Sequence, residues 1–136
     1  MSLVRPTKVR IDYSPEKPIW GVFACKPIMN NEVIEECPVI PLDGESPLPD
    51  YRFAWPKAPT DVPQVLCLPL GFGAIYNHSR NNWNATWINH PELDMVFQFI
   101  AKRDIEVGEE ICTYYDDDYY FARDAFNDIP LVGELE

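Results

Sequence analysis

The sequence lacks any apolar run long enough to cross a lipid bilayer, and its start shows no charged stretch followed by an apolar one. We therefore expect neither a membrane span nor a cleaved secretion signal. The 136 residues match the usual length of one domain, and 46% of them are hydrophobic, which is enough to bury a core. These features favour a single domain over residues 1–136 in an intracellular protein.

Cysteine and metal-binding patterns are also scarce. The four cysteines, Cys25, Cys37, Cys67 and Cys112, form no C-x-x-C pair, so the sequence gives no sign of a compact zinc site. Each has apolar neighbours, and we expect reduced, buried thiols. The three aspartates at 116–118 do not alternate as the ligands of a calcium loop do. We interpret them as a solvated acidic patch or a surface that attracts a basic substrate, and we predict no metal.

Basic residues are few. There are 11 Lys and Arg against 22 Asp and Glu, which gives a formal net charge of -11. Nucleic acid is disfavoured as a direct ligand, because phosphate binding requires a basic surface. A lysine-rich protein or peptide would instead be attracted by such a field. Solubility alone accounts for the acidity equally well, so both interpretations stay open.

No long segment has the 3.6-residue period of a helix, and 14 prolines divide the chain into short pieces. Short runs of β-branched and aromatic residues instead predict a mostly-β domain, with one or two helical turns over 121–126. The turn residues at 30–31 predict a hairpin between the strands on either side. The last predicted strand, 111–115, is expected to run back along the strand at 95–102 after a turn at 105–110. The predicted strands cover residues 4–12, 20–27, 32–40, 64–68, 85–89, 95–102 and 111–115.

Three stretches of the sequence suggest a functional site. Residues 68–85 read LPLGFGAIYNHSRNNWNA and place Asn77, His78 and Ser79 directly after a small apolar run. Polar side chains there need partners or a function, because a desolvated amide or imidazole is costly unless it is hydrogen-bonded. The other two stretches are WGVFA at 20–24 and GEEICTYY at 108–115.

Taken in order, these stretches resemble the SET domain, and most closely its small stand-alone viral and bacterial forms. The family pattern G-x-G-[VL]-F-A corresponds to IWGVFA, the N-H-S segment to YNHSRNNWNA, and G-E-E-[LI]-T-x-x-Y to GEEICTYY. The resemblance covers about residues 8–120. It implies several small twisted sheets with a C-terminal pseudoknot. It also implies an S-adenosyl-L-methionine-dependent protein-lysine N-methyltransferase that acts on a histone or another lysine-rich protein, in the cytoplasm or, with a chromatin substrate, in the nucleus.

The resemblance also implies catalytic roles for two tyrosines. Tyr115 corresponds to the family's catalytic tyrosine, whose hydroxyl orients the transferring methyl group. Tyr51 corresponds to a tyrosine that lines the lysine channel. A narrow, dry channel with aromatic walls suits methyl transfer to lysine, because the reacting amine must be neutral and desolvation lowers its pKa.

For the cofactor, S-adenosyl-L-methionine, the resemblance points to two segments and one aromatic residue. Trp20 and Gly21 match the front loop, and Gly21 would let the backbone approach the cofactor closely. Asn77 and His78 match the pair that holds the cofactor through an amide and a backbone group. Tyr120 corresponds to the aromatic that stacks on adenine, with its two neighbours in the sequence as alternatives.

The chain departs from the family pattern at two places. Ile19 replaces the first glycine of the front loop, and the insert at 80–83, which ends in Trp83, replaces the proline after N-H-S. With this insert, Asn84 is our match for the family's asparagine. The departures motivate an alternative function, a catalytically weak SET-like module that binds lysine-rich peptides. Small SET domains sometimes complete their substrate groove by dimerising, so a homodimer is a further expectation.

Overall fold

A computed structural model describes residues 2–14, 19–42 and 53–114 of the chain. This part contains nine strands and no helix, and therefore no helix long and apolar enough to cross a membrane. The mostly-β prediction is confirmed, while the helical turns predicted over 121–126 lie outside the described residues. The strands are β1 (Val9–Ser14), β2 (Ile19–Ala24), β3 (Val33–Pro41), β4 (Phe53–Trp55), β5 (Val65–Pro69), β6 (Asn77–His78), β7 (Ala85–Asn89), β8 (Val96–Ala101) and β9 (Glu110–Thr113).

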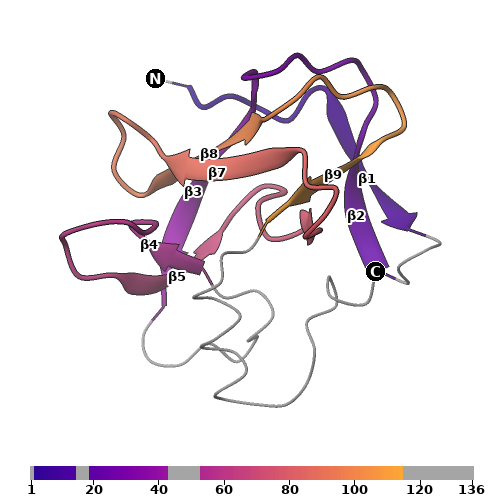
Figure 1. The fold of residues 1–136 in the computed structure, drawn as a ribbon. Helices are drawn as coiled ribbons and strands as arrows, with labels where there is room; N and C mark the ends of the chain where they lie inside the picture. Colours follow the sequence, from indigo (N-terminus) through magenta and orange to yellow (C-terminus); the bar gives the residue numbers. More distant parts are fainter. Residues whose placement is uncertain (1, 15–18, 43–52, 115–136) are drawn as a thin grey trace.

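The strands pair in the order β1-β2-β9-β7-β8-β3-β5-β4, and β6 pairs with β9 beside this path (Figure 1). Most neighbours are antiparallel, but both β6 and β7 run parallel to β9. The contacts of β9 with β2 and with β7 are short, so the path consists of small, locally distinct sheets. The last described strand therefore has three partners that come from three separate parts of the chain.

Two predicted hairpins are wrong. The second strand, β2, pairs with β1 and β9, whereas β3 pairs with β5 and β8, so the turn at 30–31 joins strands that are not neighbours. The turn itself is present, since Asn31 has a φ of 70°. Similarly, β9 does not return beside β8 but pairs with β2, β6 and β7. Both errors have one cause, because periodicity reports the conformation of a strand and not its distant partner.

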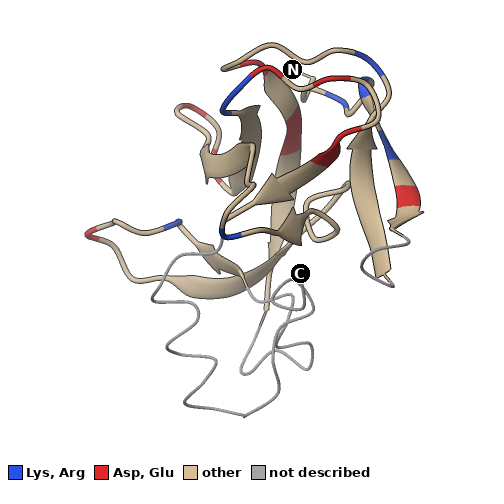
Figure 2. Cartoon of the chain, turned by 45° about the vertical axis from the view of Figure 1, so that its right-hand side comes forward, with Lys and Arg blue, Asp and Glu red and all other residues tan. Residues whose placement is uncertain are grey.

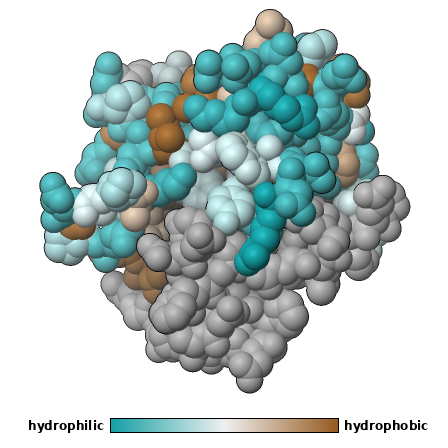
Figure 3. Space-filling view, viewed as in Figure 1, coloured by the Kyte–Doolittle hydropathy of each residue, from teal (hydrophilic) through white to brown (hydrophobic). Residues whose placement is uncertain are grey.

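The core lies along the faces of β3, β7 and β8 and is rich in aromatic side chains. Phe97 and Phe99 of β8 are almost fully buried. Phe99 stacks on Tyr76 with ring centroids 4.6 Å apart, and it also packs against Trp87. On the face shown in Figure 3, the described surface is largely hydrophilic and its apolar residues form small separate spots. Cys37, Cys67 and Cys112 are buried free thiols as expected, but Cys25 is exposed, contrary to the prediction, because it follows the end of β2.

A buried carboxyl group holds the loop that leads to β6. Glu35 on β3 is 1% exposed, and Tyr76 donates its hydroxyl hydrogen to Glu35 Oε1 over 2.5 Å. The backbone N–H of Phe72 donates to Glu35 Oε2 over 3.3 Å. Gly71 has a φ of 68°, and a Cβ there would lie 2.8 Å from Glu35 Oε2, so both backbone conformation and space require glycine. Glu35 therefore fixes the start and the end of the 71–76 segment, directly before Asn77.

Burial raises the pKa of Glu35, and the hydrogen bonds from Tyr76 and Phe72 oppose this only in part. The folded protein therefore keeps a proton on Glu35 at pH values above the ordinary 4.5, where the unfolded chain has released it. The stability that this provides is fully present below pH 4.5 and is lost as the pH rises through the raised pKa. Each unit of pKa shift corresponds to about 1.4 kcal/mol.

We predict that Glu35→Gln, which is neutral at every pH, removes this part of the pH dependence. Its free energy of unfolding should rise relative to wild type between pH 4.5 and pH 8, as measured by urea denaturation at several pH values. Glu92→Gln, at an exposed position on the β7–β8 turn, is the matched control for replacing one carboxylate. A Glu35→Gln protein with an unchanged slope would contradict the assignment.

Candidate functional site

The three sequence stretches meet where β2, β6 and β9 come together. Asn77 of β6 lies opposite Cys112 of β9, and His78 lies opposite Thr113. On the β2 side, Val22 pairs with Ile111 and Phe23 with Glu110. The pairing of β6 with β9 thus aligns residues that are about 35 positions apart in the sequence. The pairing of β2 with β9 places residues about 90 positions apart beside each other. This arrangement places Trp20, Gly21, Asn77 and His78, four of the predicted site residues, around one strand.

The side chain of Asn77 joins all three stretches. Its amide nitrogen donates to Glu110 Oε2 over 2.6 Å and to the carbonyl oxygen of Trp20 over 3.3 Å. Asn77 is buried, so these partners satisfy a group that would otherwise destabilise the fold. A Cβ at Gly21 would lie 2.5 Å from Glu110 Oε2 and 2.9 Å from Asn77 Nδ2. Glycine at position 21 therefore leaves the space in which the Asn77–Glu110 hydrogen bond forms.

His78 lies deeper and beside the end of β9. It is 1% exposed, and its ring lies against that of Tyr114 with centroids 5.5 Å apart. The backbone continues the pairing, since the N–H of Ser79 donates to the carbonyl oxygen of Thr113 over 2.9 Å. His78 thus aligns the segment that ends at Tyr114, and Tyr115 is the next residue in the sequence.

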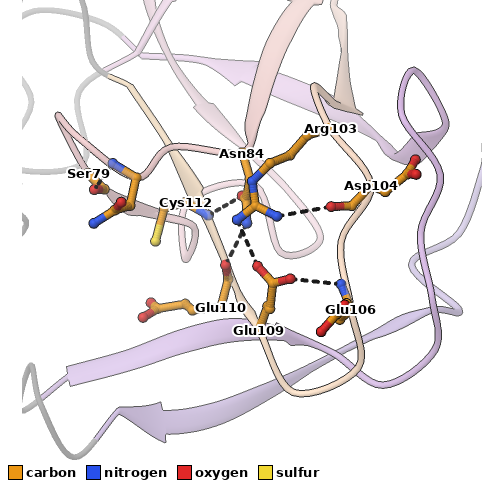
Figure 4. Close-up of polar contacts among 9 residues, drawn as sticks. Ser79, Asn84, Arg103, Asp104, Glu106, Glu109, Glu110 and Cys112 are labelled. Atoms are coloured by element: carbon orange, nitrogen blue, oxygen red, sulfur yellow. Dashed lines mark hydrogen bonds and ion pairs between the residues drawn. The ribbon is translucent and has the colours of Figure 1, made fainter.

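Asn84 bonds to the backbone of β9 with both ends of its amide. Its Nδ2 donates to the carbonyl oxygen of Glu110, and its Oδ1 accepts from the N–H of Cys112, both over 2.9 Å (Figure 4). Its own N–H donates to the carbonyl oxygen of Cys112. The side chain therefore forms hydrogen bonds to the backbone of β9 as a neighbouring strand would. Our match of Asn84 to the family's asparagine rests on sequence alone and stays a prediction.

Neither departure from the family pattern disturbs this arrangement. Ile19 begins β2 and pairs in register with Ser14 of β1, so the missing glycine leaves a regular strand. The insert at 80–83 forms an exposed turn in which the N–H of Asn82 donates to Ser79 Oγ over 2.9 Å. Trp83 is exposed, and the extra length is absorbed before Asn84 reaches β9.

The remaining predicted site residues lie outside the described part. These are Tyr115 and Tyr51, predicted for catalysis, and Tyr120, predicted to stack on adenine. Their roles stay predictions. Among the described residues, no group of His, Cys, Asp and Glu side chains is arranged to hold a metal ion.

Sequence reasoning assigned no role to two acidic residues that the structure places beside the site, Glu35 and Glu110. Glu35 had a usable signal, because it lies two residues before Cys37, which is buried in the same strand. Glu110 belongs to the quoted GEEICTYY stretch, but nothing local in the sequence indicates that its partner is Asn77.

Comparison with known proteins agrees with this geometry. The family model described as "SET domain" matches residues 19–116. A curated relative from Schizosaccharomyces pombe, a histone-lysine N-methyltransferase specific for lysine 37 of histone H3, is 28% identical over 113 residues, covering 77% of this chain and 71% of the relative. A crystal structure from Plasmodium falciparum, described as a candidate histone methyltransferase, is 30% identical with a TM-score of 0.68, covering 83% of this chain and 96% of that one.

The hydrogen bonds of Asn84 give a test of the β9 arrangement. Asn84→Ala would leave the buried N–H of Cys112 and the carbonyl of Glu110 without this partner. We expect a loss of about 2–4 kcal/mol in the free energy of unfolding, measured by chemical denaturation. Asn81→Ala, in the exposed turn three residues earlier, should change stability by less than about 0.5 kcal/mol. Equal effects of the two substitutions would show that Asn84 does not hold β9.

Proposed function

The chain belongs to the SET domain family, and on that basis we propose that it is a protein-lysine N-methyltransferase that uses S-adenosyl-L-methionine. The observation that carries the proposal is the parallel pairing of β6 with β9. It brings the Asn77–His78 segment beside the residues that lead directly to Tyr115. The relatives named as histone methyltransferases support the same activity.

The residues at the β2–β6–β9 junction fit one end of this cofactor. Its amino-acid end carries an ammonium group, which has several N–H donors and a positive charge. The carbonyl of Trp20 and the carboxylate of Glu110 offer acceptor oxygens within hydrogen-bond distance of the same nitrogen, Asn77 Nδ2. Gly21 adds no side chain to this space. The donor and acceptor chemistry therefore suits the cofactor, which when bound supplies a methyl group on a positively charged sulfur.

The chain's own contribution is to align and desolvate the substrate lysine. The hydroxyl of Tyr115, which follows β9 by two residues in the sequence, would hold the reacting atoms in line, and such positioning is worth up to about 7–11 kcal/mol in well-oriented reactions. Tyr51 would form part of an apolar wall that lowers the pKa of the lysine ammonium, so that the amine is neutral when it reacts. Both roles follow from the family resemblance.

The substrate that we propose is a lysine-containing protein such as a histone. The two relatives support this choice by their described activity. In the described part, acidic and basic positions lie near one another along the loops, as Figure 2 shows. Attraction of a basic substrate therefore relies on the net charge of the whole chain, -11.

The test of the proposal is methyl transfer to a mixture of core histones, with isotope-labelled S-adenosyl-L-methionine and mass spectrometry of the products. We expect Tyr115→Phe to lower kcat by about 100-fold or more, the scale reported for losing one positioned group in the transition state, while the protein stays folded. Tyr13→Phe, at an exposed tyrosine of β1, is the matched control and should retain activity.

Two outcomes would contradict the proposal. A folded wild-type protein that binds the cofactor but transfers no methyl group to any lysine would remove the enzymatic function. A protein that binds lysine-rich peptides by calorimetry without measurable cofactor affinity would instead be the binding module that the two sequence departures suggested.

A further inference from the structure

Glu110, the first residue of β9, has an unusual environment for a carboxylate. Its Oε2 accepts a hydrogen bond from Asn77 Nδ2 over 2.6 Å, and its own backbone carbonyl accepts from Asn84. Among the described lysines and arginines, none forms an ion pair with it. Figure 4 shows its side chain extending away from Arg103, which instead binds the neighbouring carboxylate of Glu109 over 2.7 Å. Within the described residues, the two consecutive glutamates thus differ, because Glu109 forms an ion pair with a cation and Glu110 does not.

The carboxylate also determines how the Asn77 amide is oriented. Both partners of the Asn77 nitrogen, Glu110 Oε2 and the carbonyl of Trp20, are acceptors. If the amide were turned over, its oxygen would face two other oxygens, which is unfavourable for a buried group. Glu110 therefore keeps the amide nitrogen on the side of Gly21 and leaves Asn77 Oδ1 on the opposite side. The Glu110 carboxylate and the Trp20 carbonyl thus face the amide nitrogen, the amide oxygen lies on the opposite side, and the carboxylate gives this junction a negative charge.

A site of this kind suits a primary ammonium, which carries three donors and a positive charge. An inorganic metal ion is a poorer fit, because the described residues here supply one carboxylate among two neutral oxygens. Gly21 leaves room for the Asn77–Glu110 hydrogen bond, since a Cβ there would meet both side chains. The occupant favoured by these observations is thus an organic cation.

We propose that Glu110 is a positioning residue that selects the ammonium of the cofactor's amino-acid end, by its charge and by fixing the Asn77 amide. The inference rests on the proposed function, because it assumes that the junction binds S-adenosyl-L-methionine. The competing explanation is purely structural, namely that Glu110 only ties β9 to β6. The two explanations differ in one measurable respect. A structural tie affects every ligand of the site equally, whereas charge selection affects only ligands that carry the amine.

The experiment compares two ligands by isothermal titration calorimetry. One is S-adenosylhomocysteine, and the other is its analogue without the amino group. We expect Glu110→Gln to weaken binding of S-adenosylhomocysteine by about 10- to 100-fold, the range for losing a hydrogen bond to a charged group. Binding of the analogue should change by less than about threefold. In transfer assays the KM for the cofactor should rise correspondingly, with kcat within about threefold of wild type.

Two further variants make the result specific. Glu109→Gln removes the same charge one residue earlier, where Arg103 binds the carboxylate, and should leave both affinities within about twofold. Gly21→Ala keeps the carboxylate in the chain but displaces it from Asn77, because a Cβ would lie 2.5 Å from Glu110 Oε2. It should weaken binding of S-adenosylhomocysteine more than that of the analogue. Thermal unfolding of each variant reports whether it is folded.

The outcomes separate the two proposals. Equal weakening of both ligands by Glu110→Gln, or no weakening of either, overturns the role of Glu110 while wild-type binding leaves the proposed function standing. A wild-type protein that binds neither ligand overturns both. A Gly21→Ala protein with wild-type affinity for S-adenosylhomocysteine refutes the required contact with Asn77.

Discussion

The parallel pairing of β6 with β9 is the constraint on which the rest of the site depends. Two residues of β6, Asn77 and His78, are buried and polar, and they can be placed there only because β9 and its side chains supply partners. The hydrogen bonds from Asn77 to Glu110 and from Ser79 to Thr113 provide this on one side. Asn84 provides the equivalent contacts further along. The result is a junction in which polar groups, rather than apolar packing, determine the register.

A second buried polar group fixes the segment that precedes β6. Glu35 lies on β3, a strand that has no direct pairing with β6 or β9, yet its carboxyl binds both Phe72 and Tyr76. Tyr76 in turn stacks on Phe99 of the core. The residue that precedes Asn77 is thus anchored in the hydrophobic core and to a carboxyl at the same time. Such a doubly anchored residue leaves little freedom for the amide that follows it.

The sequence predicted the individual strands better than the pairing between them. Residues 85–89 were predicted as a strand with the observed bounds, and 95–102 and 32–40 within a residue of theirs. Their alternating or aromatic-rich patterns are local properties, which is why they could be read directly. The partners of β2 and β9 could not, because they depend on hydrogen bonds between segments tens of residues apart. The order of the motifs in the sequence recovered part of this information, because Trp20, Gly21, Asn77 and His78 lie together in the structure. The roles of Tyr51, Tyr115 and Tyr120 remain predictions.

The place of β9 in the fold has a consequence for how the protein is made. It is the last described strand to leave the ribosome, yet β2, β6 and β7 all need it as a neighbour. Until it emerges, the edges of those strands stay unpaired, and the buried amides of Asn77 and Asn84 lack their partners on β9. Non-local pairing of this kind slows folding and prolongs the exposure of unpaired edges. A truncated translation product that stops before residue 110 would therefore be a substrate for chaperones and proteases rather than a partly active enzyme.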